Sequence, residues 1–159
     1  MILQNRRKRK WKAGFWLFEG EEHGTMGRRN EGEAHGMEAS LKSVTAALGT
    51  LRVGAADSEE RLHEQAAEAF ARAGLEAAHE VRLAPRCRID FMVGGVGVEI
   101  KKKRPQRAPL IAQLTRYASC PQVERLVVLA PRGVDLPKSI GGKPVTMMSL
   151  ERLWGIMLP

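Results

Sequence analysis

The stretch from residue 88 to 103, RIDFMVGGVGVEIKKK, limits the fold of this chain more than any other segment. Two runs that alternate apolar and polar residues flank the pair Gly94-Gly95, and such a pair is typical of a two-residue β-hairpin turn. With that turn, Val93 lies opposite Val96. The sequence therefore predicts a sheet built around this hairpin.

The register of the hairpin predicts which side chains meet. Asp90 lies opposite Glu99, and Arg88 lies opposite Lys101. Because side chains alternate between the faces of a strand, Asp90, Glu99 and Lys101 are expected on one face. An apolar core face is expected on the other side, formed by Ile89, Phe91, Val93, Val96, Val98 and Ile100.

Two carboxylates placed directly across a ladder repel each other. A divalent cation with hard oxygen ligands would offset that repulsion. Lys101, on the same face, is placed to orient a nucleophilic water or to neutralise phosphate charge. The alternative is an ordinary exposed hairpin face, on which Lys101 offsets part of the repulsion between Asp90 and Glu99.

This arrangement resembles the catalytic hairpin of the PD-(D/E)XK nuclease superfamily. Asp90 matches the first acid of its motif, Glu99 the second acid and Lys101 the lysine, whereas Ile89 replaces the proline that often precedes the first acid. The resemblance implies Mg²⁺-dependent hydrolysis of phosphodiester bonds in DNA, with Mn²⁺ as an alternative ion. It also implies metal ligation by Asp90, Glu99 and the main-chain carbonyl of Ile100.

A helix is expected from Asp57-Ser58 to the stop signal Gly74. Its apolar stripe consists of Leu62, Ala66, Ala69, Phe70 and Ala73. On a helical wheel, Glu59 falls inside this stripe, although a first-turn acid favoured by the helix dipole is an equal alternative. In the resembled superfamily a helix before the sheet often adds one more acid to the metal site. Glu59 is the preferred residue for it here, with Glu60 and Glu64 as lesser candidates.

A dense basic run follows the hairpin, and phosphate binding is a sensible use of it beside paired acids. The run consists of Lys102, Lys103, Arg104 and Arg107.

A second helix is expected over residues 110–119, with Pro109 at its first position. It carries Gln113 and Tyr117 on one face, and this pair resembles the Q-x3-Y motif of the RecB-like branch of the same superfamily. There, these side chains contact the DNA backbone or support the site near the lysine. Arg116 is a further candidate phosphate contact.

Composition agrees with a polyanionic partner, because the net charge is +8 and the pI is near 10. No apolar run reaches membrane-spanning length, and no membrane partner is expected. Cys87 and Cys120 have neither disulfide-framework nor metal-ligand spacing, which fits a reducing cytoplasm. Residues 1–56 are expected to form a disordered or weakly ordered basic extension, with a weak helix over residues 38–51. Trp11 or Trp16 of this extension could stack on a base, and the alternative is a dispensable extension. Residues 57–159 are expected to form one domain.

The expected elements predict an α/β fold with a mixed central sheet flanked by helices. Their order matches the αβββαβ core of the resembled superfamily over residues 57–148. A metal-dependent deoxyribonuclease is the leading interpretation. The alternatives are a non-catalytic nucleic-acid-binding protein on the same fold and an unrelated α/β scaffold. A homodimer is left open, because such small nucleases often dimerise but no stripe of this chain requires it.

Overall fold

The computed structural model describes residues 10–12, 15–17, 40–52 and 58–153. The chain divides into two compact units, Met1–His35 and Gly36–Pro159. In the first unit, strands β1 (Lys10–Lys12) and β2 (Phe15–Leu17) pair antiparallel, with Trp11 opposite Trp16 along the backbone. The stacking role expected for the tryptophans, like most of the expected basic extension, lies outside the side chains and residues that are described.

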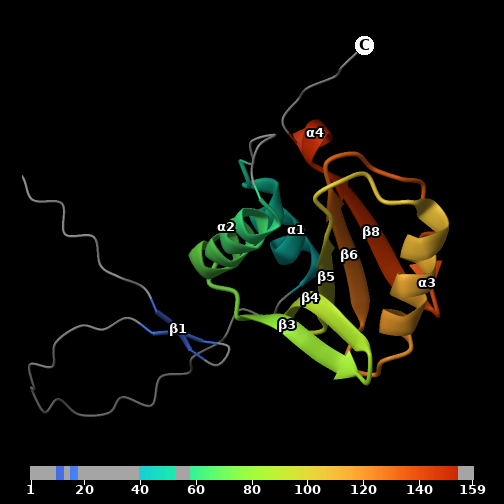
Figure 1. Cartoon of the computed structure of the whole chain (residues 1–159), viewed down its shortest axis with the longest axis horizontal. Coiled ribbons are helices and arrows are strands. Elements are labelled where there is room, and N and C mark those ends of the chain that lie inside the picture. The colour runs from blue at the N-terminus through green and yellow to red at the C-terminus, as the bar shows by residue number, and fades with distance from the viewer. Residues whose placement is uncertain (1–9, 13–14, 18–39, 53–57, 154–159) are drawn as a thin grey trace, which may run out of the picture. The chain divides into compact units, whose positions relative to one another are not determined.

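The second unit contains a six-stranded mixed sheet with the strand order β3-β4-β5-β6-β8-β7. The pairs β5/β6 and β6/β8 are parallel, and the remaining neighbours are antiparallel. The predicted α/β class with a mixed sheet is thus confirmed (Figure 1). The strands are β3 (Ala77–Ala84), β4 (Cys87–Val93), β5 (Val96–Ile100), β6 (Arg125–Ala130), β7 (Ser139–Ile140) and β8 (Lys143–Ser149).

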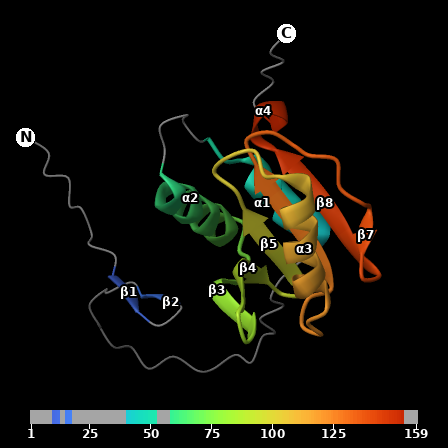
Figure 2. The same cartoon turned by 45° about the vertical axis from the view of Figure 1, so that its right-hand side comes forward.

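Helices cover both faces of the sheet, with α2 and α3 on opposite sides (Figures 1 and 2). The first two helices pack with one face of the central strands in a single apolar cluster, and α3 packs with the other face in a second cluster. The helices are α1 (Leu41–Gly49), α2 (Glu59–Arg72), α3 (Arg107–Ala118) and α4 (Leu150–Leu153).

Helix α1 makes the compact unit begin earlier than the expected boundary at residue 57. Ser40 caps the helix by accepting a hydrogen bond from the Ser43 N–H at 3.1 Å. The Val44 and Leu48 side chains are fully buried and share the apolar cluster of α2. The sequence predicts only a weak helix here, because a short helix is stabilised mainly by what it packs against.

Helix α2 lies within its predicted bounds, and its cap is Ser58, whereas Asp57 lies outside the described residues. The Ser58 side chain caps it by accepting a hydrogen bond from the Arg61 N–H at 3.2 Å. At the other end Gly74 has φ +68°, and the Leu75 N–H donates to the Phe70 carbonyl at 3.0 Å. This is the Schellman arrangement that glycine allows without steric cost. These two caps fix the length of the helix. Glu59 in its first turn lines a pocket together with Lys101, the residue that follows β5.

Candidate active site at the fork between β4 and β5

Strands β4 and β5 separate at the end of β5, beyond the pair Phe91 and Val98, and we call this opening the fork. The predicted register is confirmed for Val93 opposite Val96 and continues to Phe91 opposite Val98, where the pairing ends. The next residue pair, Asp90 and Glu99, was expected to continue the ladder and does not. Instead, the Ile100 N–H donates to Asp90 Oδ2 at 2.7 Å, so that a carboxylate occupies the place of a main-chain acceptor.

A kink in the neighbouring strand accompanies this fork. In β3, His79 pairs with Phe91 and Val81 with Ile89, whereas Glu80 between them has φ +53°. This is a left-handed backbone conformation that non-glycine residues rarely adopt. The regular alternation of side chains is interrupted at the same level of β4.

The kink also overturns part of the predicted pattern of faces. Ile89 was expected on the face of Phe91, but it packs in the α3-side cluster, whereas Phe91 belongs to the α1/α2-side cluster. Ile89 fits there because Gly97 has no side chain: a Cβ at residue 97 would lie 2.6 Å from Ile89 Cδ1. Asp90 consequently lies between the two faces rather than on one of them.

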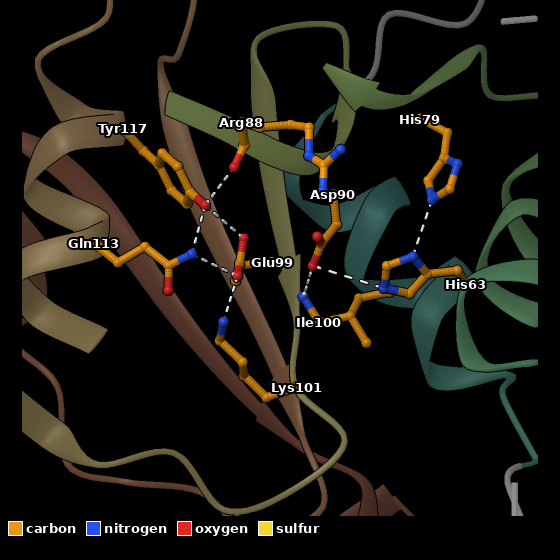
Figure 3. Close-up of polar contacts among 9 residues, drawn as sticks. All are labelled: His63, His79, Arg88, Asp90, Glu99, Ile100, Lys101, Gln113 and Tyr117. Carbon is orange, nitrogen blue, oxygen red and sulfur yellow. Dashed lines mark hydrogen bonds and ion pairs between the residues drawn. The ribbon is translucent and has the colours of Figure 1, made fainter. Parts of the chain in front are cut away.

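Glu99 lies on the α3 side of β5 and is held by three donors. Its side chain is only 4% exposed, and Lys101 Nζ donates to its Oε1 at 2.6 Å. Gln113 Nε2 donates to the same oxygen at 2.8 Å, and the Tyr117 hydroxyl lies 3.0 Å from Oε2 (Figure 3). Helix α3 thus brings the predicted Gln113–Tyr117 pair onto the second acid of the hairpin.

Tyr117 also ties α3 to the strand that carries the first acid. Its hydroxyl lies 2.7 Å from the Arg88 carbonyl and 2.6 Å from Gln113 Nε2. A hydroxyl has one proton to donate, so the Arg88 carbonyl and the Glu99 carboxylate compete for it. Burial and the charge of Glu99 both raise the pKa of Tyr117, which keeps the phenol protonated at neutral pH.

The electrostatics of the site oppose the negative charge of Glu99. Burial is the largest cause that raises the pKa of this carboxyl, and the nearby Asp90 charge is the second. The hydrogen bond and charge of Lys101 act in the opposite direction. A buried acid with another acid beside it is costly for a fold and is characteristic of functional sites.

A histidine pair approaches Asp90 from the other side of the fork. His63 Nδ1 lies 2.9 Å from His79 Nε2, and His63 Nε2 lies 3.8 Å from Asp90 Oδ2. The Nε2 atom is buried and has no hydrogen-bond partner in the described part of the chain. Figure 3 shows His63 between His79 and Asp90, with Glu99 on the opposite side of Asp90.

The sequence by itself assigned no role to His63. Its distance along the chain from His79 and Asp90 follows no metal-ligand spacing, and only packing of α2 on the sheet brings the three together. The position of this histidine next to Leu62 of the apolar stripe was the one signal available in the sequence. The ring also packs edge-on against Phe91, with centroids 5.7 Å apart.

Oxygen atoms at the fork could hold a divalent cation. Asp90 and Glu99 supply carboxylates, and the Ile100 carbonyl faces the Asp90 side, because the N–H and C=O of a strand residue point the same way. His63 Nε2, buried beside Asp90 without a hydrogen bond from the described residues, fits a ligand bound at this position. Within the described residues, no three His, Cys, Asp or Glu side chains gather closely enough to hold a metal alone. Mg²⁺ suits such a sparse set, since it usually retains several waters.

The acid expected from the preceding helix lies near the fork but is exposed. Glu59 is solvent-exposed rather than inside the apolar stripe, and it lines a pocket of about 450 Å³ with Lys101 and Gln113. Glu64 instead pairs with Arg61 at 3.0 Å. Glu60 lies in the first turn of α2. Hydrogen bonds with its own backbone N–H and with the Ser58 side chain lower the pKa of its carboxyl.

The predicted basic residues divide between two places. The exposed Lys102, Lys103 and Arg104 line the same pocket as Glu59, next to Lys101. Arg107 lies outside that lining, and its Nε donates to the Asp135 carbonyl at 2.8 Å. Arg116 lines a second pocket on the other side of Gln113.

Comparisons with protein-family models, curated proteins and solved structures give no match for this chain. The geometry of the fork therefore carries the functional argument by itself. As for membranes, the described residues include no helix that is long and apolar enough to cross one.

Proposed function

We propose that the protein is a metal-dependent nuclease that hydrolyses phosphodiester bonds in DNA, with a restriction endonuclease-like core of the PD-(D/E)XK type. The observation that carries this proposal is the buried Glu99 carboxylate, bound to Lys101 at 2.6 Å, beside Asp90 at an open fork in the sheet. A fold gains no stability from two neighbouring acids of which one is 4% exposed. A cation site explains why both are present.

Asp90, Glu99 and the Ile100 carbonyl are the residues that would hold Mg²⁺, or Mn²⁺ in its place. When bound, the ion would polarise the scissile phosphate and lower the pKa of a coordinated water. His63 Nε2, buried next to Asp90 Oδ2, would orient this carboxylate or contribute to the same ion.

Lys101 would act at the reacting phosphate. Its side chain is 30% exposed, so that its ammonium group reaches both Glu99 and the solvent. From there it can donate to the attacking water or to a phosphate oxygen and can stabilise developing negative charge. Gln113 and Tyr117 keep Glu99 in place through their hydrogen bonds and are positioning residues.

The substrate strand would pass over the cationic pocket next to Lys101. Three exposed basic residues from one loop line that pocket, and they supply charge without sequence information. Glu59, at the rim, would hold a second ion or a bound water. We therefore expect binding that depends strongly on salt and weakly on base sequence.

The direct test is cleavage of labelled linear and branched DNA with Mg²⁺, with Mn²⁺ and with a chelator. The wild-type chain should cleave only with a divalent ion. The variants Asp90→Asn and Lys101→Met should lose about 100-fold or more in rate, the usual cost of removing a group that acts in the transition state. Asp135→Asn, at an exposed acid that lines neither cationic pocket, is the matched control.

The same preparations separate this proposal from the main alternative. DNA binding by the wild-type chain without cleavage under any metal condition would favour a non-catalytic binder on this fold. Cleavage that survives Asp90→Asn would show that the activity arises elsewhere.

A further inference from the structure

The structure contains a second cationic pocket, which lies outside the substrate path proposed over Lys102, Lys103 and Arg104. It has a volume of about 430 Å³ and lies between the β3–β4 hairpin and α3. Four arginines line it, together with Cys87, Gln113 and Tyr117. The arginines are Arg82, Arg86, Arg88 and Arg116.

The charge of this pocket is little compensated. In the described part of the chain, Arg88 is the one arginine of the four in an ion pair, with Glu80 at 3.5 Å. Arg82, Arg86 and Arg116 are exposed, so that their guanidinium groups can turn towards a ligand. Four like charges around one concavity repel one another unless an anion lies among them.

The backbone at the pocket is also unusual. Arg86 occupies the turn between β3 and β4 with φ +59°, a conformation in which glycine or asparagine is the common residue. An arginine at this position accepts backbone strain and places a cation at the rim. Strain of this kind concentrates at functional sites.

The Gln113 side chain, which donates to Glu99, lines both cationic pockets and lies between them. The pocket lined by Lys102, Lys103 and Arg104 lies on one side of the acidic site, and the four-arginine pocket lies on the other. A chain of phosphates crossing Glu99 and Lys101 would meet both.

We infer that the four-arginine pocket binds phosphate groups of the substrate strand on the side of the scissile bond opposite Lys102–Arg104. Arginine suits this role because its planar guanidinium binds phosphate oxygens in pairs. This inference rests on the proposed nuclease function and adds a substrate-binding site to it. The phosphate is either an internal diester or the terminal phosphate of a strand.

The test measures binding rather than cleavage. Fluorescence anisotropy with labelled single-stranded and double-stranded oligonucleotides, in chelator, compares the wild-type chain with Arg82→Gln/Arg86→Asn. Asparagine is chosen at residue 86 because it tolerates the left-handed backbone. The control, Arg72→Gln/Arg125→Gln, removes the same charge from two exposed arginines outside the pocket, which pair with Glu68 and Glu124.

We expect the pocket variant to bind about tenfold or more weakly than the control variant. On single strands the slope of log affinity against log salt should fall by about 1.4, the value for two lost phosphate contacts. Oligonucleotides with and without a 5′-phosphate separate the two sources: a terminal-phosphate site loses affinity only for the phosphorylated strand, and a diester site loses it for both.

Equal affinity of the pocket and control variants would overturn the inference, even if the wild-type chain cleaves DNA with Mg²⁺. A wild-type chain that neither binds nor cleaves nucleic acid would remove the proposed function and this site with it. Circular dichroism and thermal unfolding of each variant exclude loss of the fold as the cause.

Discussion

At the residue scale, the central feature is a glutamate kept in a position that disfavours its charge. Burial and the neighbouring Asp90 raise the pKa of Glu99 above that of the unfolded chain. The unfolded chain therefore releases this proton at a lower pH than the folded chain. Stability from this group is greatest at low pH and is lost as the pH rises through the interval between the two pKa values.

We expect Glu99→Gln to stabilise the fold at neutral pH by about 1 kcal/mol, the usual size of a single stabilising change. The advantage should shrink as the pH falls towards 4.5, the ordinary pKa of this group. Lys101 does not become a buried unpaired charge in the variant, because its side chain is 30% exposed. Urea unfolding at several pH values measures the effect. Lower stability of the variant at neutral pH would mean that the ion pair with Lys101 outweighs burial.

Tyr117 provides a second residue-scale test. Tyr117→Phe keeps the buried ring and removes the hydroxyl that meets Glu99 at 3.0 Å and the Arg88 carbonyl at 2.7 Å. We expect a loss of about 1–2 kcal/mol in the free energy of unfolding, since a buried acceptor loses its donor.

The control for this change is Thr115→Val on the same helix. The Thr115 hydroxyl bonds only within the helix, to the Ile111 carbonyl, and is exposed. Its replacement should change stability by less than about 0.5 kcal/mol. If both variants are equally stable, the Tyr117 hydroxyl contributes nothing to the connection between α3 and the hairpin.

At the element scale, α1 decides where the folded unit begins. This nine-residue helix is too short to be stable alone, but it buries Val44 and Leu48 completely against α2 and the sheet. A chain that starts at residue 57 would leave that apolar surface exposed.

Leu48→Ala should therefore cost about 2–5 kcal/mol in the free energy of unfolding, as other buried leucines do. Lys42→Ala, at an exposed position of the same helix, should stay within about 0.5 kcal/mol of the wild-type chain. Denaturant unfolding of both variants measures the difference. A small effect of Leu48→Ala would return the domain boundary to residue 57.

The elements also explain which sequence signals were informative. The Gly94-Gly95 turn fixed the Val93–Val96 pair, and Gly74 ended α2 at the expected stop. These signals are local, because backbone conformation at a turn or cap depends on a few adjacent residues. The kink at Glu80 carried no such signal, and with it the position of Ile89 was missed.

At the scale of the whole molecule, a cation at the fork should couple to folding. A ligand that binds only the folded state raises the melting temperature according to its affinity. We expect millimolar Mg²⁺ to raise the melting temperature of the wild-type chain by a few degrees. Asp90→Asn should abolish this shift, whereas Asp135→Asn should retain it. An equal shift in all three proteins would indicate nonspecific binding of the ion.

The sequence alone determined the hairpin, its register near the turn, the mixed α/β class and the Glu99–Lys101 pair on one face of β5, because these follow from local periodicity and turn chemistry. Only the tertiary structure placed α3 so that Gln113 and Tyr117 hold Glu99, and α2 so that His63 meets Asp90. It also gathered four arginines from the β3–β4 hairpin, including its turn, and from α3 into one pocket. Such contacts join residues far apart in the chain, and they depend on how helices pack on a kinked sheet, which no local pattern encodes.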